Sequence, residues 1–463
     1  MKPTYEELEQ ELATTRQELA TTKEVLRLAL DRIAKLEEQI NKNSKNSSKP
    51  PSSDQKSNRP DNMKKTRDRR KGVSRQLVPA ERVDRHVHCT LENCPHCGSC
   101  QLKEKDVFEI LQQVELPEIR AIVTEYILKK FHCGNCKKNC TATLPEGVPF
   151  SAFGPNIMAL VATLTGGYLL PKRDALQLIK DLYDIDIGLG SISNIEERVT
   201  KALHSVGERI HAFVLKSGLS THFDETGWRD SGKRHFAWIA CNQQASIFKI
   251  HRSRSGQAFE ELTKGQQEFS AVTDRYAVYR KLKGIHQYCL AHLIRDFQKY
   301  AERDGPDQEL GESIVQIFRK ACKIHARYRE GRISWRTRSQ GLGRLKKKLP
   351  TSFADALANG SDEIARLSEK LWDEFEHVWA FMKVKGLEPT NNLAERNLRN
   401  LVIRRKRSYG TRSERGKRFV ETITSVSVTA RQQGINIYNF MKDAVLRYFS
   451  KMEAPFMTSA FSF

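Results

Sequence analysis

Two aspartates stand where apolar, β-prone runs end, 50 positions apart in the sequence. Residues 221–224 and 269–274 are each typical of a strand, and Asp224 and Asp274 are their last residues. A carboxylate at the end of a strand is rigidly aimed, and carboxylate oxygens are the ligands that Mg²⁺ prefers in proteins. The two runs therefore predict two rigidly placed metal ligands.

A third carboxylate is expected from a helix far along the chain. Pro389 and the polar residues after it predict a capped helix start, which places Glu395 near the beginning of that helix. Arg399 lies one turn further on the same face, and a surface ion pair is the commoner explanation of such spacing. Residues 391–420 carry 10 basic and 2 acidic residues, and this charge favours a nucleic-acid contact instead. We therefore expect Glu395 to hold a metal ion and the following cations to hold phosphate: Arg399, Arg404, Arg405, Lys406, Arg407 and Arg412.

Two Cys-x-x-Cys pairs, Cys94 with Cys97 and Cys133 with Cys136, predict a metal site of another kind. Each pair places two thiolates on one tight turn, which is half of a tetrahedral Zn²⁺ site. The intervening residues suit β-strands, notably over 115–129, so the spacing fits a zinc ribbon with a hairpin. Free cysteines or a redox pair are the alternative. Spare side chains leave the exact ligands open: Cys89, Cys100, Cys140, His96 and His132.

The elements that must position the carboxylates follow an ordered pattern from residue 217 onward. Three β-prone runs come first, then a helical stretch, then two more β-prone runs: residues 221–224, 235–240, 246–250, 258–262, 269–274 and 285–290. Gly232 stands where a hairpin turn would join the first two runs. Three antiparallel strands followed by alternating helix and strand is the order of an RNase H-like fold. We expect this catalytic domain over residues 217–450, with a helical insertion at about 303–385 and a C-terminal tail over 451–463.

Residues 148–216 are predicted to be helical, because apolar residues recur there at helical spacing. The glycine turn at 188–190 and Ser191 after it predict a helix start. One interpretation is a helix-turn-helix that reads DNA, and ordinary helix packing is the other. In the insertion, Trp335, Arg338 and the lysines at 346–348 are candidates for contacts with DNA ends, with a solvated surface as the alternative.

The first 40 residues have apolar side chains at intervals of seven, which predicts a coiled coil over residues 1–40 and a chain that is at least dimeric. A lone solvated helix is the alternative. Residues 41–76 have almost no large apolar side chains and predict a flexible basic linker. The zinc-binding domain is expected over residues 77–147. The linker cations that we expect to contact phosphate are Lys64, Lys65, Arg69 and Arg70.

The composition of the whole chain limits its partners. The 463 residues include 78 Lys and Arg against 56 Asp and Glu, a net charge of +22, and a protein this basic usually faces a polyanion. No apolar run approaches the ~18 residues of a membrane span, and the charged start lacks the apolar core of a secretory signal. We therefore expect a multidomain protein of the α+β and α/β classes, cytoplasmic, associated with the nucleoid and without a membrane partner.

Several of these segments together resemble one known family. Four motifs are similar to those of the insertion sequence 66 family of DDE transposases, namely residues 224–226, 272–276, 289–297 and 391–396. The heptads, the linker and the paired cysteines resemble that family's leading modules in the same order. The resemblance implies that Asp224, Asp274 and Glu395 form the DDE triad, and that Cys289 and His292 form a Cys-x-x-His signature.

The activity implied by this resemblance is Mg²⁺-dependent cleavage of the ends of a bacterial mobile element and their joining to target DNA. The triad would hold two Mg²⁺ ions per active site, with Mn²⁺ as a substitute, and the Zn²⁺ would be structural. Double-stranded DNA and other copies of the chain are the expected partners, together with accessory proteins that the element encodes. Two alternatives stay open: a non-catalytic DNA-binding regulator, and an RNase H-like nuclease that cuts without joining strands.

Overall fold

The computed structural model describes residues 5–40, 42–43, 77–103, 110–117 and 119–457 of the chain. The chain divides into two compact units, one formed by residues 1–60 together with 123–463, and the other by residues 61–122. Helices predominate, and a mixed sheet lies in the larger unit, which confirms the expected combination of α and β structure.

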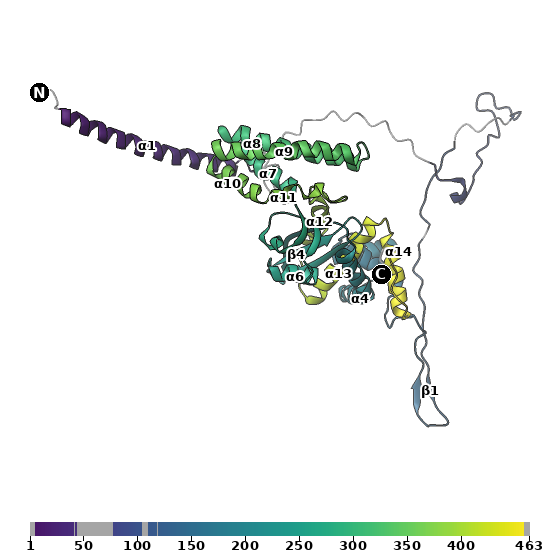
Figure 1. The fold of residues 1–463 in the computed structure, drawn as a ribbon. Coiled ribbons are helices and arrows are strands. Elements are labelled where there is room, and N and C mark those ends of the chain that lie inside the picture. Colours follow the sequence, from purple (N-terminus) through teal and green to yellow (C-terminus); the bar gives the residue numbers. More distant parts are fainter. Residues whose placement is uncertain (1–4, 41, 44–76, 104–109, 118, 458–463) are drawn as a thin grey trace. The chain divides into compact units, whose positions relative to one another are not determined.

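A five-stranded mixed sheet, of which Figure 1 labels β4, lies in the larger unit, and its strand order is β5-β4-β3-β6-β7. The strands are β3 Thr221–Asp230, β4 Lys233–Cys241, β5 Ser246–His251, β6 Glu268–Thr273 and β7 Lys283–Tyr288. β3, β4 and β5 pair antiparallel, whereas β3, β6 and β7 pair parallel. Ser231 and Gly232 both have positive φ, as a tight hairpin between β3 and β4 requires, so the turn expected at Gly232 is confirmed.

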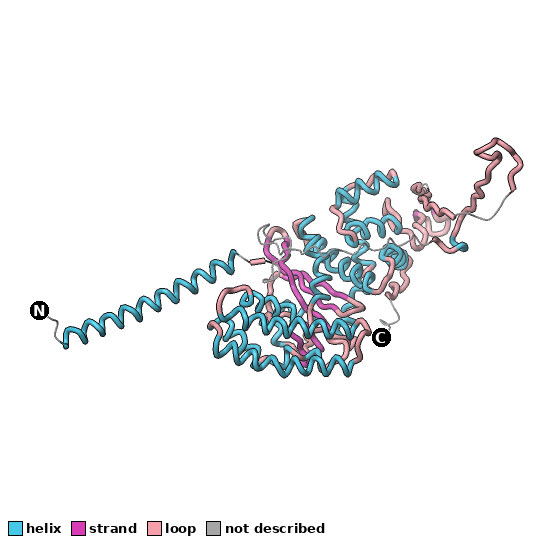
Figure 2. The backbone as a smooth tube through the Cα atoms, turned by 90° about the horizontal axis from the view of Figure 1, so that it is seen from above, coloured by secondary structure: helices cyan, strands magenta, loops and turns pink. Residues whose placement is uncertain are grey.

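Helices pack against the sheet, and Figure 2 shows its strands (magenta) running between groups of helices. The contacting helices include α6 Gly256–Thr263, α12 Asn392–Ser408 and α13 Glu414–Gln432. Alternate residues of β4 belong to different apolar clusters, because successive side chains of a strand point to opposite faces. Trp238 packs with Phe259 of α6, whereas Ile239 packs with Leu398 of α12. The sheet is therefore buried on both faces at this strand.

The segment predicted to be helical over 148–216 is helical. Its elements are α2 Pro155–Ala162, a π-helical segment Thr163–Gly167, α3 Lys172–Tyr183, α4 Leu189–Ala202 and α5 His204–Lys216. The N-cap predicted at Ser191 is three residues too late, because Gly188 already has the extended backbone of an N-cap and α4 begins at Leu189. α4 packs on α2 and α13 and buries Ile192, Ile195 and Val199 in a cluster shared with the sheet. DNA reading by these helices stays a prediction.

The insertion before the predicted third carboxylate is helical, as expected. α7 Leu290–Ala301 precedes it. The insertion comprises α8 Pro306–Arg329, α9 Trp335–Asn359, α10 Asp362–Asp373, α11 Phe375–Val378 and a 3-10 turn Ala380–Met382. The proposal that Arg338 contacts DNA is wrong, since its side chain is fully buried. It donates to the Phe381 carbonyl at 2.8 Å and to His325 Nδ1, and its guanidinium lies 4.4 Å from the Trp335 ring centroid. Arg338 therefore stabilises the packing of α9 on α8.

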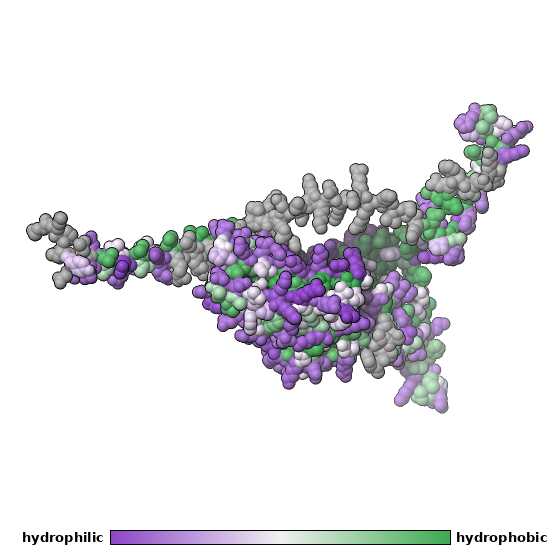
Figure 3. Space-filling model, turned by 45° about the horizontal axis from the view of Figure 1, so that its top comes forward, coloured by the Kyte–Doolittle hydropathy of each residue, from purple (hydrophilic) through white to green (hydrophobic). Residues whose placement is uncertain are grey.

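The N-terminal heptads form one helix, α1 Tyr5–Ile40. Its described apolar side chains at the heptad positions are exposed, and Figure 3 shows hydrophobic residues (green) interspersed with hydrophilic ones along it. The exposed side chains are Tyr5, Leu12, Leu19, Leu26, Ile33, Leu36 and Ile40. The predicted linker lies outside the described residues except for 42–43, and with it Lys64, Lys65, Arg69 and Arg70.

The cysteine-rich segment contains one short hairpin, formed by β1 Lys130–His132 and β2 Asn139–Thr141. The prediction of strands over 115–129 is wrong for the described residues of that stretch, which are not assigned to a strand. Ile122, Val123 and Ile127 are highly exposed there, so the apolar alternation is not matched by a buried face.

The last helix, α14 Ile437–Phe449, packs on α2 and α4. After it, Arg209 donates to the carbonyls of Ala454 at 3.0 Å and Pro455 at 2.8 Å, which ties the described start of the predicted tail to α5. Within the part of the chain that the structure describes, we find no helix with the length and apolar character needed to cross a membrane.

Candidate active site

Asp224 and Asp274 lie on neighbouring parallel strands. β3 and β6 pair in parallel as far as His222 and Val272, and the same register continued by two residues sets Asp224 level with Asp274. Asp274 directly follows β6, as predicted. The prediction that Asp224 ends its strand is wrong, because β3 continues to Asp230 as a hairpin with β4 after its pairing with β6 has ended.

Neither aspartate has a basic partner. Of the ion pairs among the described residues, none within 4.0 Å includes Asp224 or Asp274. Each accepts one backbone N–H at 2.9 Å, Asp224 from Glu225 and Asp274 from Tyr276. Burial raises the pKa of Asp224 well above its usual range, and the negative charges of Glu225, Asp274 and Glu395 raise it further. Burial also raises the pKa of Asp274. The charges of Arg254 and Arg275 oppose this rise at Asp274 without reversing it. Desolvated carboxylates of this kind would be stabilised by a cation.

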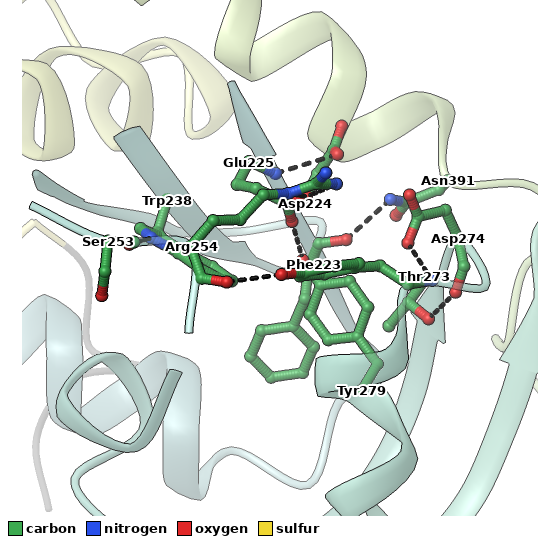
Figure 4. Close-up of polar contacts among 11 residues, drawn as sticks. Phe223, Asp224, Glu225, Trp238, Ser253, Arg254, Thr273, Asp274, Tyr279 and Asn391 are labelled. Atoms are coloured by element: carbon green, nitrogen blue, oxygen red, sulfur yellow. Dashed lines mark hydrogen bonds and ion pairs between the residues drawn. The ribbon is translucent and has the colours of Figure 1, made fainter. Parts of the chain in front are cut away.

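Glu225 is a fourth carboxylate beside Asp224, but it is compensated. Its side chain is 2% exposed and accepts hydrogen bonds from Arg254 Nε at 2.7 Å and from the Tyr279 hydroxyl (Figure 4). Arg254 is held in turn over the ring of Tyr276, 3.8 Å from its centroid. These contacts offset part of the charge of Glu225, whose pKa burial still raises, and they leave its neighbour Asp224 without a bonded cation.

Glu395 approaches the two aspartates from a helix. It lies in the first turn of α12, as predicted, and its charge contributes to the raised pKa of Asp224. Its Oε1 lies 3.8 Å from His292 Nδ1 and 3.7 Å from Arg295 Nη2, both on α7. The ion pairs described for Glu395 do not include Arg399, so a surface pair between them is not the arrangement found.

Asn391, at the N-cap of α12, connects the elements that carry the carboxylates. Its side chain does not cap the helix as the sequence predicts; instead its amide donates to the Phe223 carbonyl at 2.7 Å, and its Oδ1 lies 3.1 Å from His222 Nδ1. Its backbone N–H donates to Cys289 Sγ at 3.1 Å. The side chain is fully buried, so these bonds fix the start of α12 against β3 and the start of α7.

Cys289 and His292 lie at the start of α7, close to Glu395. The Cys289 backbone N–H donates to the Thr273 carbonyl at 2.8 Å, next to Asp274. Burial raises the pKa of the Cys289 thiol to about 11. Burial, followed by the charge of Arg295, lowers the pKa of His292 to about 4, so its imidazole is neutral at pH 7.

The predicted phosphate contacts along α12 divide into two groups. Arg404 donates to the Thr165 carbonyl of the π-helical segment, and Arg405 donates to the Gly227 carbonyl of β3. Both guanidinium groups therefore have an internal carbonyl as a partner, and their contact with phosphate stays a prediction. The remaining candidates have exposed side chains, namely Arg399, Lys406 and Arg407 on α12 and Arg412 after it, and Arg407 also donates to the Leu169 carbonyl at 3.4 Å.

Each Cys-x-x-Cys pair forms a turn with the same backbone bonding. The Cys94 carbonyl accepts the Gly98 N–H at 2.8 Å, and the Cys133 carbonyl accepts the Lys137 N–H at 2.9 Å. Gly98 and Lys137 both have positive φ. Nearby backbone N–H groups, that of His96 foremost for Cys94 and that of Cys136 foremost for Cys133, lower the pKa of both thiols, which favours the thiolate that a metal needs.

The matches to known families agree with these features. The model of a family described as "Transposase IS66 family" matches residues 151–418, more than half of the chain. The chain belongs to the IS66 family of transposases. A family described as "zinc-finger binding domain of transposase IS66" matches residues 92–137, which include both cysteine pairs, and a family of unknown function matches residues 1–82. This IS66 transposase therefore has a zinc-finger domain ahead of its transposase domain, which confirms the expected family and the expected structural zinc.

The chain is also similar to one protein over most of its length. The transposase is 24% identical to "Uncharacterized protein y4hP" of Sinorhizobium fredii (strain NBRC 101917 / NGR234) over 392 residues. The matched region covers 76% of this chain and 70% of that protein.

Three residues of the site of the IS66 transposase were not singled out by sequence reasoning. Asn391 was interpreted only as part of a helix start, and Glu225 only as part of a motif, although its place directly after Asp224 was a signal. Arg254 stands 29 positions from Glu225 and has no local pattern that marks it. Only the fold brings its loop beside β3.

Proposed function

We propose that Asp224, Asp274 and Glu395 are the DDE triad of this transposase and that they bind two Mg²⁺ ions, with Mn²⁺ as a substitute. The observation that carries the proposal is the buried pair of aspartates without a basic partner, to whose charge Glu395 adds. Repulsion among desolvated carboxylates favours binding of a divalent cation, and donor sets made of oxygen alone suit Mg²⁺.

The sheet supports an RNase H-like catalytic core within residues 217–450. Three antiparallel strands are followed by two that continue the sheet in parallel on the other side of β3, in the order β5-β4-β3-β6-β7. Asp224 then lies on the central strand β3, level with Asp274 directly after the neighbouring strand β6. The helical insertion of this domain, predicted at about 303–385, separates α7 from Glu395 in the sequence but not in space.

The Mg²⁺ ions, when bound, would lower the pKa of a water that attacks the phosphodiester and would stabilise the leaving 3′ oxygen. The residues of the chain would hold the three carboxylates in place. Strand pairing fixes the backbones of Asp224 and Asp274, and the bonds of Asn391 fix the helix that carries Glu395. Arg254 holds Glu225 in an ion pair, which keeps that carboxylate from competing for the metal. In the joining step, the freed 3′-hydroxyl would take the place of the water.

DNA would follow the exposed cations after Glu395. Arg399, Lys406, Arg407 and Arg412 have exposed side chains, and clustered exposed cations bind phosphate with release of counter-ions. We extend the proposal to the linker over 41–76, whose Lys64, Lys65, Arg69 and Arg70 would add phosphate contacts. Double-stranded DNA of the element ends and of the target is the proposed substrate, and the nucleoid is the proposed location.

We also propose roles for the segments outside the catalytic domain. Cys94, Cys97, Cys133 and Cys136 would bind one structural Zn²⁺ in a domain over residues 77–147. α1 would form a coiled coil with another copy of the chain, because its exposed apolar stripe is otherwise solvated. Residues 148–216 would form a helical domain and 451–463 a tail.

The test is a paired assay on labelled element ends and target DNA with Mg²⁺. The wild-type protein should cut the ends and join them, and Asp224→Asn should bind the ends but do neither. Asp307→Asn is the matched control, because Asp307 is a buried carboxylate bonded to Ser361 in the insertion. Cutting without joining would identify a nuclease, and binding without cutting by the wild-type protein would identify a regulator.

A further inference from the structure

A second set of possible metal ligands adjoins the proposed triad but differs from it in chemistry. Among the residues that the structure describes, Cys289, His292 and Glu395 bring a sulfur, a nitrogen and an oxygen atom within 4.8 Å of one another. Cys289 is the N-cap of α7, His292 lies in the first turn of that helix, and Glu395 lies in the first turn of α12. The bonds of Asn391 hold these two helix starts together.

The nitrogen and the oxygen of this cluster lack partners. His292 Nδ1 and Glu395 Oε1 are both buried, and neither has a hydrogen-bond partner. They lie 3.8 Å apart, which is too long for a hydrogen bond between them. Buried polar atoms in native proteins are nearly always paired, so two orphaned atoms that face each other indicate a missing partner between them.

The donor set matches Zn²⁺ better than Mg²⁺. Thiolate, imidazole and carboxylate are all ordinary Zn²⁺ ligands, whereas Mg²⁺ prefers oxygen alone. From the usual Zn–ligand lengths, a tetrahedral site needs neighbouring donor atoms about 3.4–3.6 Å apart. The observed 3.8 Å between His292 and Glu395 is close to this spacing. The Asn391 N–H that donates to Cys289 Sγ at 3.1 Å would stabilise a metal-bound thiolate.

Arg295 is the competing partner of the same carboxylate. Its Nη2 lies 3.7 Å from Glu395 Oε1, beyond hydrogen-bond distance, and its own Nε is buried without a partner. The guanidinium therefore offsets part of the charge of Glu395 without satisfying its oxygen. A carboxylate has two oxygens, so binding one cation through Oε1 is compatible with a role in the DDE triad.

We propose that Cys289, His292 and Glu395 bind one Zn²⁺, with water completing the tetrahedron. This ion is distinct from the Zn²⁺ of the cysteine pairs and from the Mg²⁺ of the triad, because it has one thiolate and one imidazole among its ligands. It would join α7 to α12 and hold Glu395 in a fixed orientation toward Asp224. Its role would be positional, since it neither needs nor excludes Mg²⁺ at the aspartates.

The test is the zinc content of purified full-length protein. Wild type should contain two Zn²⁺ per chain, Cys289→Ser and His292→Ala should each contain one, and Cys133→Ser should lose the other. Cys241→Ser is the matched control, because Cys241 is equally buried in β4 but lies outside the cluster, and it should keep both ions. Far-UV circular dichroism verifies folding, and if Cys289→Ser fails to fold, His292→Ala decides.

The absorption spectrum of the Co²⁺-substituted protein tests the proposed site independently of the zinc content. With Co²⁺ in place of Zn²⁺, Cys133→Ser should retain the weak thiolate-to-metal band of a site with a single sulfur ligand, and His292→Ala should retain the strong band of the cysteine pairs. The proposal is overturned by wild-type zinc content in both Cys289→Ser and His292→Ala, or by a single ion in wild type that Cys133→Ser removes. Neither readout depends on DNA cleavage, so it separates this site from the proposed catalysis.

Discussion

Asp224→Asn should make the metal-free protein more stable while removing its response to Mg²⁺. The aspartate is buried, has no basic partner within 4.0 Å, and faces the charges of Glu225, Asp274 and Glu395. Asparagine keeps the shape of the side chain and can still accept the Glu225 N–H. The change therefore removes an unfavourable charge without opening a cavity.

The direction of the pKa shift of Asp224 determines the sign of the expected change in stability. Because folding raises this pKa above its ordinary value near ~3.9, ionisation of Asp224 destabilises the fold as the pH rises from that value through the raised pKa. Removing one desolvated group without a partner should increase the free energy of unfolding at pH 7 by about 1–3 kcal/mol. At roughly 2 °C per kcal/mol, Tm should rise by about 2–6 °C. Below about pH 4 the carboxyl is protonated in both states, and the gain should vanish.

Mg²⁺ should reverse the order of stability of the wild-type protein and Asp224→Asn. At a concentration 100 times its Kd, a ligand that binds only the folded state adds about 2.7 kcal/mol to the stability of the wild-type protein. Asp224→Asn lacks one ligand and should gain much less. Thermal unfolding of both proteins across a Mg²⁺ titration, in buffer without chelator so that zinc is retained, measures both effects.

Asp307→Asn is the control for this titration. Asp307 accepts hydrogen bonds from the Ser361 N–H at 2.8 Å and from its hydroxyl at 2.6 Å, so its loss should lower Tm and leave the Mg²⁺ response intact. The reasoning is refuted if Asp224→Asn is no more stable than wild type without Mg²⁺ and gains as much from Mg²⁺ as wild type does.

Four further changes test the other parts of the protein. Glu395→Gln should abolish cleavage and keep binding to element ends, and cleavage by this variant would mean that the third carboxylate lies elsewhere. Arg399→Ala should weaken binding to element ends and reduce the slope of its salt dependence by about 1, as gel shifts over a salt series would show. Cys133→Ser should remove one zinc and unfold the finger, which metal analysis and limited proteolysis of the full chain would detect, and unchanged zinc would contradict the predicted ligands. Deleting residues 1–40 should reduce the mass measured by light scattering to that of a monomer, and an unchanged mass per particle, corrected for the deletion, would mean that α1 does not drive association.

Much of this protein follows from local pattern. The heptads of α1, the helices of 148–216 and the insertion have apolar residues at helical spacing, and that spacing is a property of neighbouring residues. The hairpin at Gly232 follows from the turn chemistry of one residue. The candidate carboxylates and both cysteine pairs were also evident, because their chemistry depends on residue type and short spacing.

Tertiary structure decided what each polar side chain contacts. Arg338 and Arg404 are cations like Arg399, and no local pattern separates them, yet the first is buried against His325 and the second bonds to a carbonyl 239 positions away. The same holds for Arg254, which compensates Glu225 across 29 positions. Burial and pairing depend on which elements pack together.

The prediction of strands over 115–129 failed because local pattern does not determine strand pairing either. Their alternating apolar residues are typical of a strand, but a strand also needs a neighbouring strand to pair with, and the described residues there are not assigned to a strand. The position of Asp224 inside β3 was hidden for a related reason, because the length of a strand is set by the neighbour that pairs with it. Local sequence determined which residues could do chemistry, and pairing between distant segments determined where each one lies.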